Sequence, residues 1–209
     1  MIPTPDLTHL NRGDYLHVYE PAEDTFILLD ALEQDAEELR ALAPLISLEI
    51  GFIGQILGSS GTLCITTDIN PHACRCTQRT GIKNKIPIDP ILASLSTPFY
   101  RRLQHAVDIL TFNPPYVPTV FDEMEAAQVT AGITGSWAGG TDGMDITNVF
   151  LKQVEHLLSP TGRLYLVAVK ENDVPGICER MRQEYGLQST VVLHRRAGRE
   201  HLFVVRFCR

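Results

Sequence analysis

Short apolar runs alternate along the chain with longer segments in which apolar residues recur at the spacing of a helix face. The apolar runs predict strands at residues 45–50, 62–67, 88–92, 107–112, 163–169, 188–194 and 201–207. The periodic segments predict helices at residues 23–42, 71–83, 143–158 and 174–185. Alternating strands and helices build an open, mostly parallel sheet with helices on both faces, and the last two strands add an antiparallel hairpin at one edge. We therefore predict an α/β fold with a seven-stranded sheet.

Two regions lie outside this alternation. Residues 1–18 are polar and interrupted by proline and glycine, so we predict an N-terminal arm followed by one domain over residues 19–209. Residues 117–141 are rich in proline, glycine and threonine and predict a long loop, with a short helix around residues 123–128. Long loops within compact domains often carry function, so this loop is a candidate wall of a binding site.

Polar residues follow three of the predicted strands. Glu49 and Gly51 end the first, Asp68 ends the second, and Asn113 follows the fourth. Ligands of such sheets bind outside the carboxyl ends of the strands, so these residues are expected to share one site. Asp68 is placed to accept hydrogen bonds from the ribose of a nucleoside. The alternative is that Asp68 caps the next helix, although Asn70 is better placed to do so.

Asn113-Pro114-Pro115-Tyr116 is the strongest chemical signal. The nitrogen of an amide or aromatic amine is a poor nucleophile because its lone pair is delocalised, and methyl transfer from a sulfonium needs that lone pair aimed at the carbon. The Asn113 side-chain oxygen and the Pro114 carbonyl can hold the two N–H bonds, and the two prolines stiffen the turn. Tyr116 can stack on the planar group. The alternative is an ordinary turn that ends a strand.

Charge and cysteine content narrow the class of protein. Lys and Arg total 18 against 25 Asp and Glu, a net charge of −7, which disfavours sequence-independent binding to nucleic acid. No signal peptide or membrane-spanning run is evident, so we expect a cytoplasmic protein, with the nucleus as a second compartment. The five cysteines include no CxxC pair and indicate a reducing compartment. His72, Cys74 and Cys76 lack the spacing of a zinc site, and we predict no metal.

Six segments across nearly the whole chain share one resemblance. They are Tyr19-Glu20-Pro21-Ala22-Glu23-Asp24-Thr25, Leu48-Glu49-Ile50-Gly51, Thr67-Asp68-Ile69-Asn70-Pro71, Phe112-Asn113-Pro114-Pro115-Tyr116-Val117, Trp137-Ala138-Gly139-Gly140 and Lys170-Glu171-Asn172. Together they resemble the class I S-adenosylmethionine-dependent methyltransferases, which are Rossmann-like. Within that class they are similar to the eukaryotic branch of the HemK-like glutamine methyltransferases.

The resemblance implies S-adenosylmethionine as cofactor and, as substrate, the side-chain amide of the glutamine in the Gly-Gly-Gln motif of a translation release factor. It also implies a heterodimer with a small zinc-binding activator subunit, which covers an apolar surface at the sheet edge. The implied cofactor contacts are Thr25, Glu49, Gly51, Asp68, Ile69, Ser94, Leu95 and Asn113. The implied substrate contacts are Asn113, Pro114, Pro115 and Tyr116, of which Asn113 and Tyr116 are catalytic. Trp137 either forms a wall of the substrate groove or anchors its loop to the core.

The chain departs from the family after Gly51, where a second glycine-rich stretch is expected. Ten residues separate Gly51 from Thr62, whereas a parallel crossover usually needs about a dozen or more. We therefore predict that roughly eight residues are absent between Gly51 and Phe52, by the same crossover requirement. The alternative is a true deletion with a weakened or lost cofactor site.

Two other functions remain open at this point. An adenine N6-methyltransferase acting on nucleic acid uses the same acceptor logic, although such enzymes need a basic surface and base-flipping contacts. A scaffold that kept the fold but lost the cofactor loop would not be an enzyme at all.

Overall fold

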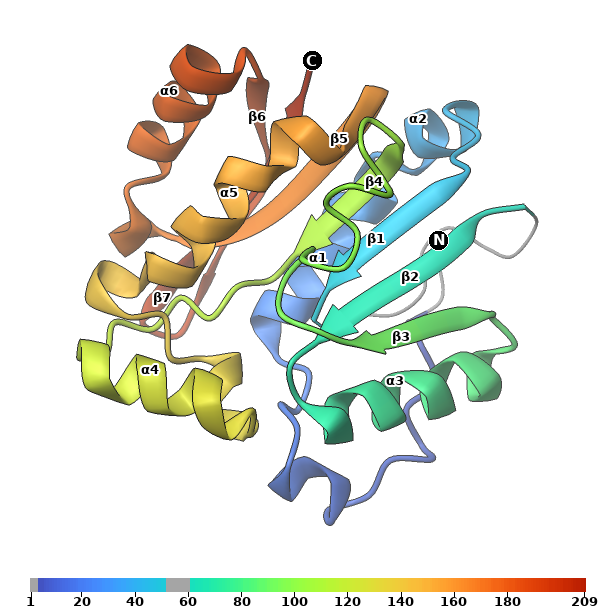
Figure 1. Cartoon of the computed structure of the whole chain (residues 1–209), viewed down its shortest axis with the longest axis vertical. Helices are drawn as coiled ribbons and strands as arrows, with labels where there is room; N and C mark the ends of the chain where they lie inside the picture. Colours follow the sequence, from blue (N-terminus) through green and yellow to red (C-terminus); the bar gives the residue numbers. More distant parts are fainter. Residues whose placement is uncertain (1–3, 52–60) are drawn as a thin grey trace.

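A seven-stranded sheet forms the centre of the molecule (Figure 1). The computed structural model describes residues 4–51 and 61–209. Its strands are β1 Ile46–Ile50, β2 Leu63–Asp68, β3 Ile88–Leu92, β4 Val107–Phe112, β5 Leu158–Val169, β6 Gln188–Ala197 and β7 Glu200–Cys208. They lie in the order β3-β2-β1-β4-β5-β7-β6.

The strand directions match the predicted sheet. β1 to β5 are parallel to one another, and β7 runs antiparallel between β5 and β6. The predicted α/β fold with an antiparallel C-terminal edge hairpin is thus confirmed. The predicted gap between Gly51 and Phe52 lies outside the described residues.

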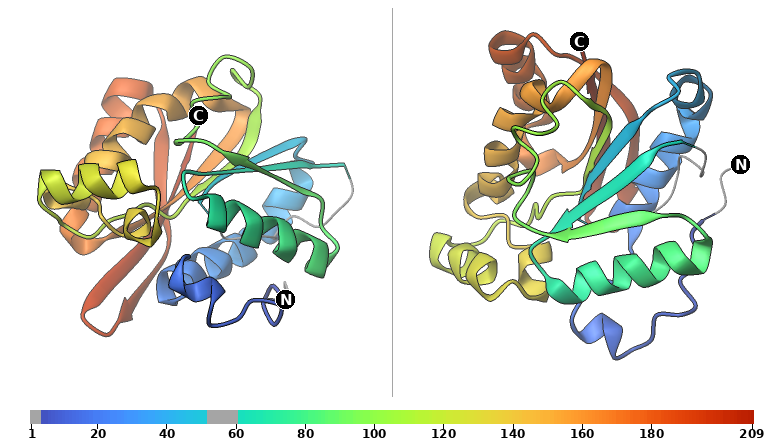
Figure 2. Two further views of the ribbon diagram at one scale, coloured as in Figure 1. Left: turned by 60° about the horizontal axis from the view of Figure 1, so that its bottom comes forward. Right: turned by 45° about the vertical axis from the view of Figure 1, so that its right-hand side comes forward.

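Helices cover both faces of the sheet (Figure 2). They are α1 Glu23–Gln34, α2 Ala36–Ala41, α3 Pro71–Asn84, α4 Phe121–Thr130, α5 Asp145–Leu157 and α6 Val174–Tyr185, with short 3-10 helices η1 Asp14–Leu16, η2 Ile133–Ser136, η3 Thr141–Gly143 and η4 Lys170–Asn172. Alternate residues of β5 point to opposite faces, as expected for a strand buried on both sides. Tyr165 and Val167 pack in the core beneath α1 and α2, whereas Leu164 and Leu166 pack beneath α5 and α6.

The helix predicted over residues 23–42 was wrong as a single element, because it breaks at Asp35 into α1 and α2. The Asp35 carboxylate accepts hydrogen bonds from the Tyr165 hydroxyl and from Arg206 Nη1, both at 2.7 Å. A buried phenol and a half-buried guanidinium need such a partner. Both donors belong to strands β5 and β7, so no local pattern could reveal this turn.

Two further boundaries differ from the prediction. The helix predicted over residues 143–158 ends at Leu157, and β5 starts at Leu158 rather than at residue 163, with a register shift against β4 between Val107 and Ile109. The segment predicted as a loop over residues 117–141 holds the whole of α4, which is longer than the short helix expected there, as well as η2. The helical part of this segment therefore forms one wall of the site described below.

Residues 7–18 pack along α3. Leu10 and Val18 form a small buried cluster with Ala73 and Cys76, and Arg79 Nη1 lies 2.7 Å from the Asp14 carboxylate. This contact brings Val18 and the segment that follows it to the end of the sheet where β2 stops. Among the described residues no helix combines the length and apolarity required to cross a membrane.

Replacing Asp35 by alanine is expected to lower the free energy of unfolding by about 3 kcal/mol, because it leaves the Tyr165 hydroxyl and the Arg206 guanidinium without their shared acceptor. Chemical denaturation measures the change. Glu37→Ala, at an exposed position on α2, is the control and should change the stability by less than about 0.5 kcal/mol. Equal stabilities for the two variants would contradict this account of the helix break.

Candidate functional site

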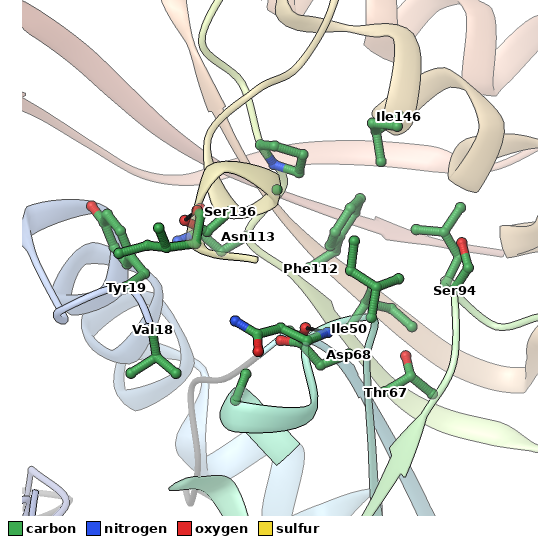
Figure 3. Close-up of a pocket in the computed structure, with 18 of the residues that line it drawn as sticks. Val18, Tyr19, Ile50, Thr67, Asp68, Ser94, Phe112, Asn113, Ser136 and Ile146 are labelled. Atoms are coloured by element: carbon green, nitrogen blue, oxygen red, sulfur yellow. Dashed lines mark hydrogen bonds between the residues drawn. The ribbon is translucent and has the colours of Figure 1, made fainter. Parts of the chain in front are cut away.

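A deep pocket opens where β1, β2 and β4 end. Its empty space is about 1050 Å³ when the open mouth is included. Figure 3 shows side chains from distant parts of the sequence around it, among them Tyr19, Asp68, Ser94, Asn113 and Ile146. The parallel order β2-β1-β4 explains this convergence, because adjacent parallel strands end at one edge of the sheet.

Most residues predicted to contact a cofactor line this pocket. They are Thr25, Gly51, Asp68, Ile69, Ser94, Leu95 and Asn113. Glu49 is the exception, because it is partly buried on β1 and is not among the lining residues. The structure thus brings seven of the eight predicted residues together, while the role of each stays a prediction.

The carboxylate of Asp68 lies at the end of β2. Its Oδ1 accepts a 2.7 Å hydrogen bond from the Asn70 backbone N–H, and Asn70 in turn caps α3 by accepting from the His72 N–H at 2.8 Å. Asn70 is therefore the cap, as expected, and Asp68 is left to face the pocket. Burial raises the pKa of Asp68 to about 6, against the opposing effect of the Asn70 and Ile69 N–H groups.

Apolar side chains form much of the remaining wall. Ile50, Ile69, Leu95 and Phe112 line the pocket together. The η2 helix closes one side through Gly135, where a Cβ would lie 3.2 Å from the Ile69 Cδ1. This spacing is tight for a side chain, so the glycine allows η2 to approach the wall closely.

Asp24 is the centre of a hydrogen-bond network that the sequence analysis did not assign to the site. It lies in the first turn of α1, and only 5% of its surface is exposed. Its Oδ1 accepts from the Thr25 backbone N–H at 2.7 Å and from the Tyr19 hydroxyl at 3.1 Å. Its Oδ2 accepts from Asn113 Nδ2 at 2.9 Å and from the Tyr116 hydroxyl at 3.3 Å.

The Asn113 amide is oriented by this contact. A carboxylate has no hydrogen to donate, so the group facing Asp24 must be the Asn113 NH₂. The Asn113 Oδ1 then points away from Asp24, and it is buried without a hydrogen-bond partner among the described residues. Leaving a buried acceptor unpaired costs about 1–3 kcal/mol, which makes this atom a strong candidate for a ligand contact.

The rest of the Asn113–Tyr116 turn divides between two hollows. Pro115 lines the deep pocket, whereas Pro114 is buried and lines neither hollow. Tyr116 lines a second, shallower hollow near the β6–β7 turn, where its hydroxyl lies 3.5 Å from Glu200 Oε2. Tyr19 and Asp24 line both hollows and so connect them.

The charges around Tyr116 keep it in its neutral form. Burial, together with the nearby Asp24 and Glu200 carboxylates, raises the pKa of Tyr116 well above its usual range, and burial with Asp24 does the same for Tyr19. Both phenols are therefore hydrogen-bond donors near neutral pH. Burial and Asp24 also raise the pKa of Glu200.

Trp137 lines neither hollow, and its side chain is partly buried. Its carbonyl accepts the Val117 N–H at 3.0 Å, which ties its loop to the residues after the Pro-Pro-Tyr turn. A direct contact with substrate stays a prediction.

Glycines near Trp137 explain the neighbouring motif. A Cβ at Gly139 would lie 2.4 Å from the Pro115 carbonyl oxygen, and one at Gly143, where φ is +68°, would lie 2.0 Å from the Tyr116 carbonyl oxygen. Only glycine permits this approach, which presses the loop against the backbone of the turn. Asn172 adds a further brace by donating to the Asp142 carbonyl at 3.3 Å.

Sequence reasoning missed Asp24 and Tyr19 as site residues, although both belong to the conspicuous Tyr19–Thr25 run. Taken alone, that run predicts the first turn of a helix, where acidic side chains interact favourably with the helix dipole. A signal was available, because the start of a helix does not require a tyrosine five residues before the aspartate. The sequence could not show that Asp24 meets Asn113, which is 89 residues away.

Comparisons with known proteins identify relatives of this chain. No family model matches the chain. It is 43% identical to human "Methyltransferase HEMK2" over 98% of this chain and 95% of that protein, and 42% identical to the mouse protein of the same name over 99% and 96%. It is 40% identical to the Schizosaccharomyces pombe "eRF1 methyltransferase catalytic subunit mtq2" over 100% and 96%.

Solved structures agree at the level of the fold. A chain of the E. cuniculi Mtq2–Trm112 complex superposes with a TM-score of 0.61 at 23% identity, covering 92% of this chain and 98% of that one. The T. thermophilus 16S rRNA N2 G1207 methyltransferase, in complex with AdoMet and guanosine, also gives 0.61, at 14% identity over 90% of this chain and 43% of that one. The resemblance stated from the motifs and the predicted Rossmann-like class I fold are confirmed, and the chain belongs to the HEMK2/Mtq2 family of methyltransferases.

Proposed function

We propose that this chain transfers the methyl group of S-adenosylmethionine to the side-chain amide nitrogen of the glutamine in the Gly-Gly-Gln motif of a translation release factor. The observation that carries the proposal is the buried, unpartnered Oδ1 of Asn113, whose orientation is fixed by Asp24. The relatives support it, since the S. pombe protein is named as the catalytic subunit of an eRF1 methyltransferase. The E. cuniculi complex is described as responsible for methylating the termination factor eRF1.

The pocket suits S-adenosylmethionine. Asp68 offers carboxylate oxygen to ribose hydroxyls, and Ile69 and Leu95 offer apolar contact to an adenine face. Gly51 lines the pocket with a φ of +89°, a backbone conformation that glycine adopts without strain. Thr25 and Asn113 also line the pocket.

The part of the site around Asn113 suits a neutral nitrogen nucleophile that accepts the methyl group. Bound S-adenosylmethionine supplies a methyl group on a positively charged sulfur. Asn113 Oδ1 accepts one N–H of the substrate amide and thereby fixes the direction of the nitrogen lone pair. Positive charge develops on that nitrogen as the new bond forms. The S–CH3 bond would break as the N–C bond forms, so the sulfur would leave as a neutral thioether. The amide needs no base before transfer, because it becomes acidic only as it gains the methyl group, and its proton then passes to water.

The substrate glutamine reaches this point through the shallower hollow. That hollow shares Asp24 and Tyr19 with the deep pocket and is open at the β6–β7 turn. Tyr116 lies along its wall as a neutral donor, able to contact the planar amide. A glutamine flanked by glycines suits this route, because glycines add no side chains beside the hollow.

A small zinc-binding activator subunit completes the enzyme by covering the β3 edge of the sheet. Leu63, Ile91 and Leu92 of β2 and β3 are exposed by 47%, 36% and 59%, and no described strand pairs with the outer side of β3. Exposed apolar edges favour association. The relatives support a partner, since one is named a catalytic subunit and another was solved as a complex with Trm112.

Replacing Asn113 by alanine in the complex is expected to reduce methyl transfer to a release factor by about 10²–10³-fold, because the amide loses the group that orients it. The dissociation constant for S-adenosylmethionine should rise by no more than about fivefold, the value of one lost hydrogen bond. Transfer of labelled methyl groups and calorimetry measure the two quantities.

Asn148→Ala on α5, outside both hollows, is the matched control and should keep wild-type transfer. Parallel assays with duplex DNA and RNA test the adenine alternative. Transfer to nucleic acid but not to the release factor would overturn the proposed substrate, and full activity of Asn113→Ala would remove Asn113 from its role.

Asp68→Asn is expected to weaken cofactor binding while stabilising the free protein. The pKa of Asp68 is raised to about 6, so burying its ionised carboxylate lowers the stability of the folded protein. This cost disappears as the pH falls from about 6 to about 4, because the folded state binds the proton more tightly than the unfolded state. The variant should therefore gain about 2 kcal/mol over wild type at pH 8 and nothing below about pH 4. Denaturant unfolding at several pH values measures the gain.

The cofactor affinity of the wild-type protein should fall below about pH 6, because protonated Asp68 is a poorer acceptor for ribose hydroxyls. Affinity that stays constant between pH 8 and pH 5 would contradict the ribose role.

Leu92→Asp should prevent stable assembly with the activator subunit, since it introduces a charge on the apolar edge of β3. Co-purification and size-exclusion chromatography of the co-expressed subunits measure assembly. Val129→Asp, equally apolar and 80% exposed on α4, should assemble normally. If Leu92→Asp assembles as well as Val129→Asp, the partner lies elsewhere.

A further inference from the structure

We propose that Asp24 determines whether the catalytic amide of Asn113 presents an acceptor or a donor to the substrate, and that it thereby selects for a nitrogen that carries hydrogen. This inference rests on the proposed function and adds a positioning residue to it. It starts from the contacts of one buried carboxylate whose two oxygens face different donors.

The first oxygen of Asp24 accepts a backbone hydrogen bond whose direction is fixed. Oδ1 accepts the Thr25 backbone N–H at 2.7 Å and the Tyr19 hydroxyl at 3.1 Å, and the Thr25 hydroxyl lies 3.4 Å away. A backbone N–H in the first turn of a helix donates in a fixed direction. Whatever atom stands at this position must therefore be an acceptor.

The second oxygen faces Asn113. Oδ2 accepts from Asn113 Nδ2 at 2.9 Å and from the Tyr116 hydroxyl at 3.3 Å. Tyr116 has a second acceptor within reach in Glu200 Oε2 at 3.5 Å, whereas Asn113 Nδ2 has only Asp24 among the contacts of its side chain in the described structure. The orientation of the Asn113 amide thus depends on Oδ2 alone.

An asparagine at position 24 would reverse that orientation. Its carbonyl oxygen must take the place of Oδ1 to satisfy the Thr25 N–H, so its NH₂ takes the place of Oδ2. Two NH₂ groups then face each other, and Asn113 relieves the conflict by rotating its amide half a turn. The substrate would meet an N–H donor where the wild-type protein presents Oδ1, although volume and shape hardly change.

Exchanging the two residues restores the acceptor. In the double variant Asp24→Asn/Asn113→Asp, the NH₂ of residue 24 donates to one carboxylate oxygen of residue 113. The other carboxylate oxygen of residue 113 then faces the substrate amide. The exchanged pair carries the same net charge as the wild-type pair, so the comparison isolates the direction of the hydrogen bond.

The test measures kcat and KM for methylation of a release factor by the complex, using wild type, Asp24→Asn and the double variant. Asp24→Asn is expected to lower kcat by about 100-fold, the effect of losing one preorganised hydrogen-bonding group, with KM and the S-adenosylmethionine dissociation constant nearly unchanged. The kcat of the double variant is expected to be at least tenfold higher than that of Asp24→Asn. Asp30→Asn is the matched control on the same helix, since Asp30 pairs with Arg195 and lines neither hollow.

A readout independent of turnover is the side-chain NH₂ signal of Asn113, identified by its absence from the spectrum of Asn113→Ala. In wild type these protons are held against Asp24 and should exchange slowly with water, whereas in Asp24→Asn they face the open pocket and should exchange faster.

Unchanged kcat and unchanged exchange in Asp24→Asn would overturn the proposal. So would a loss of kcat that comes with an equal loss of cofactor affinity or melting temperature and is not recovered in the double variant, since Asp24 would then be merely structural. Failure of the wild-type complex to methylate the release factor would instead refute the proposed function, while the exchange measurement would still decide the role of Asp24.

Discussion

The hydrogen bond between Asp24 and Asn113 joins the two parts of the molecule on which the site depends. Asp24 opens α1, which covers one face of the sheet, and Asn113 follows β4 at the centre of that sheet. Because the contact is partly buried and charge-assisted, it fixes the start of the helix against the end of the strand. It also leaves one oxygen of Asn113 unpaired at the edge of the pocket, so the same interaction that holds the elements together creates the chemical feature of the site.

The remaining elements support that contact from several sides. Gly139 and Gly143 press a loop against the backbone of the Pro-Pro-Tyr turn, and Asn172 holds that loop in place. Gly135 lets η2 approach Ile69 and close the opposite wall. Motifs that are far apart in the sequence therefore support the same part of the structure, the surroundings of Asn113.

The sequence predicted the sheet, the order of the elements along the chain and most of the residues that line the pocket. These predictions rest on strand periodicity and on the rule that ligands bind at strand ends, which are local or topological properties. It missed the break at Asp35, whose cause is a pair of donors on β5 and β7. It missed Asp24 for the same reason, because its partners at Asn113 and Tyr116 are distant in sequence. What was lost each time was a polar contact between remote residues, which no local pattern encodes.

The nitrogen that receives the methyl group belongs to a glutamine side chain. Tandem mass spectrometry of a release factor treated with the complex and S-adenosylmethionine tests it most directly. The predicted result is a single methyl group on the side-chain nitrogen of the glutamine in Gly-Gly-Gln, absent when Asn113→Ala replaces the wild-type chain. A methyl group on any other residue, or an unmodified glutamine after treatment with an active complex, would contradict the account.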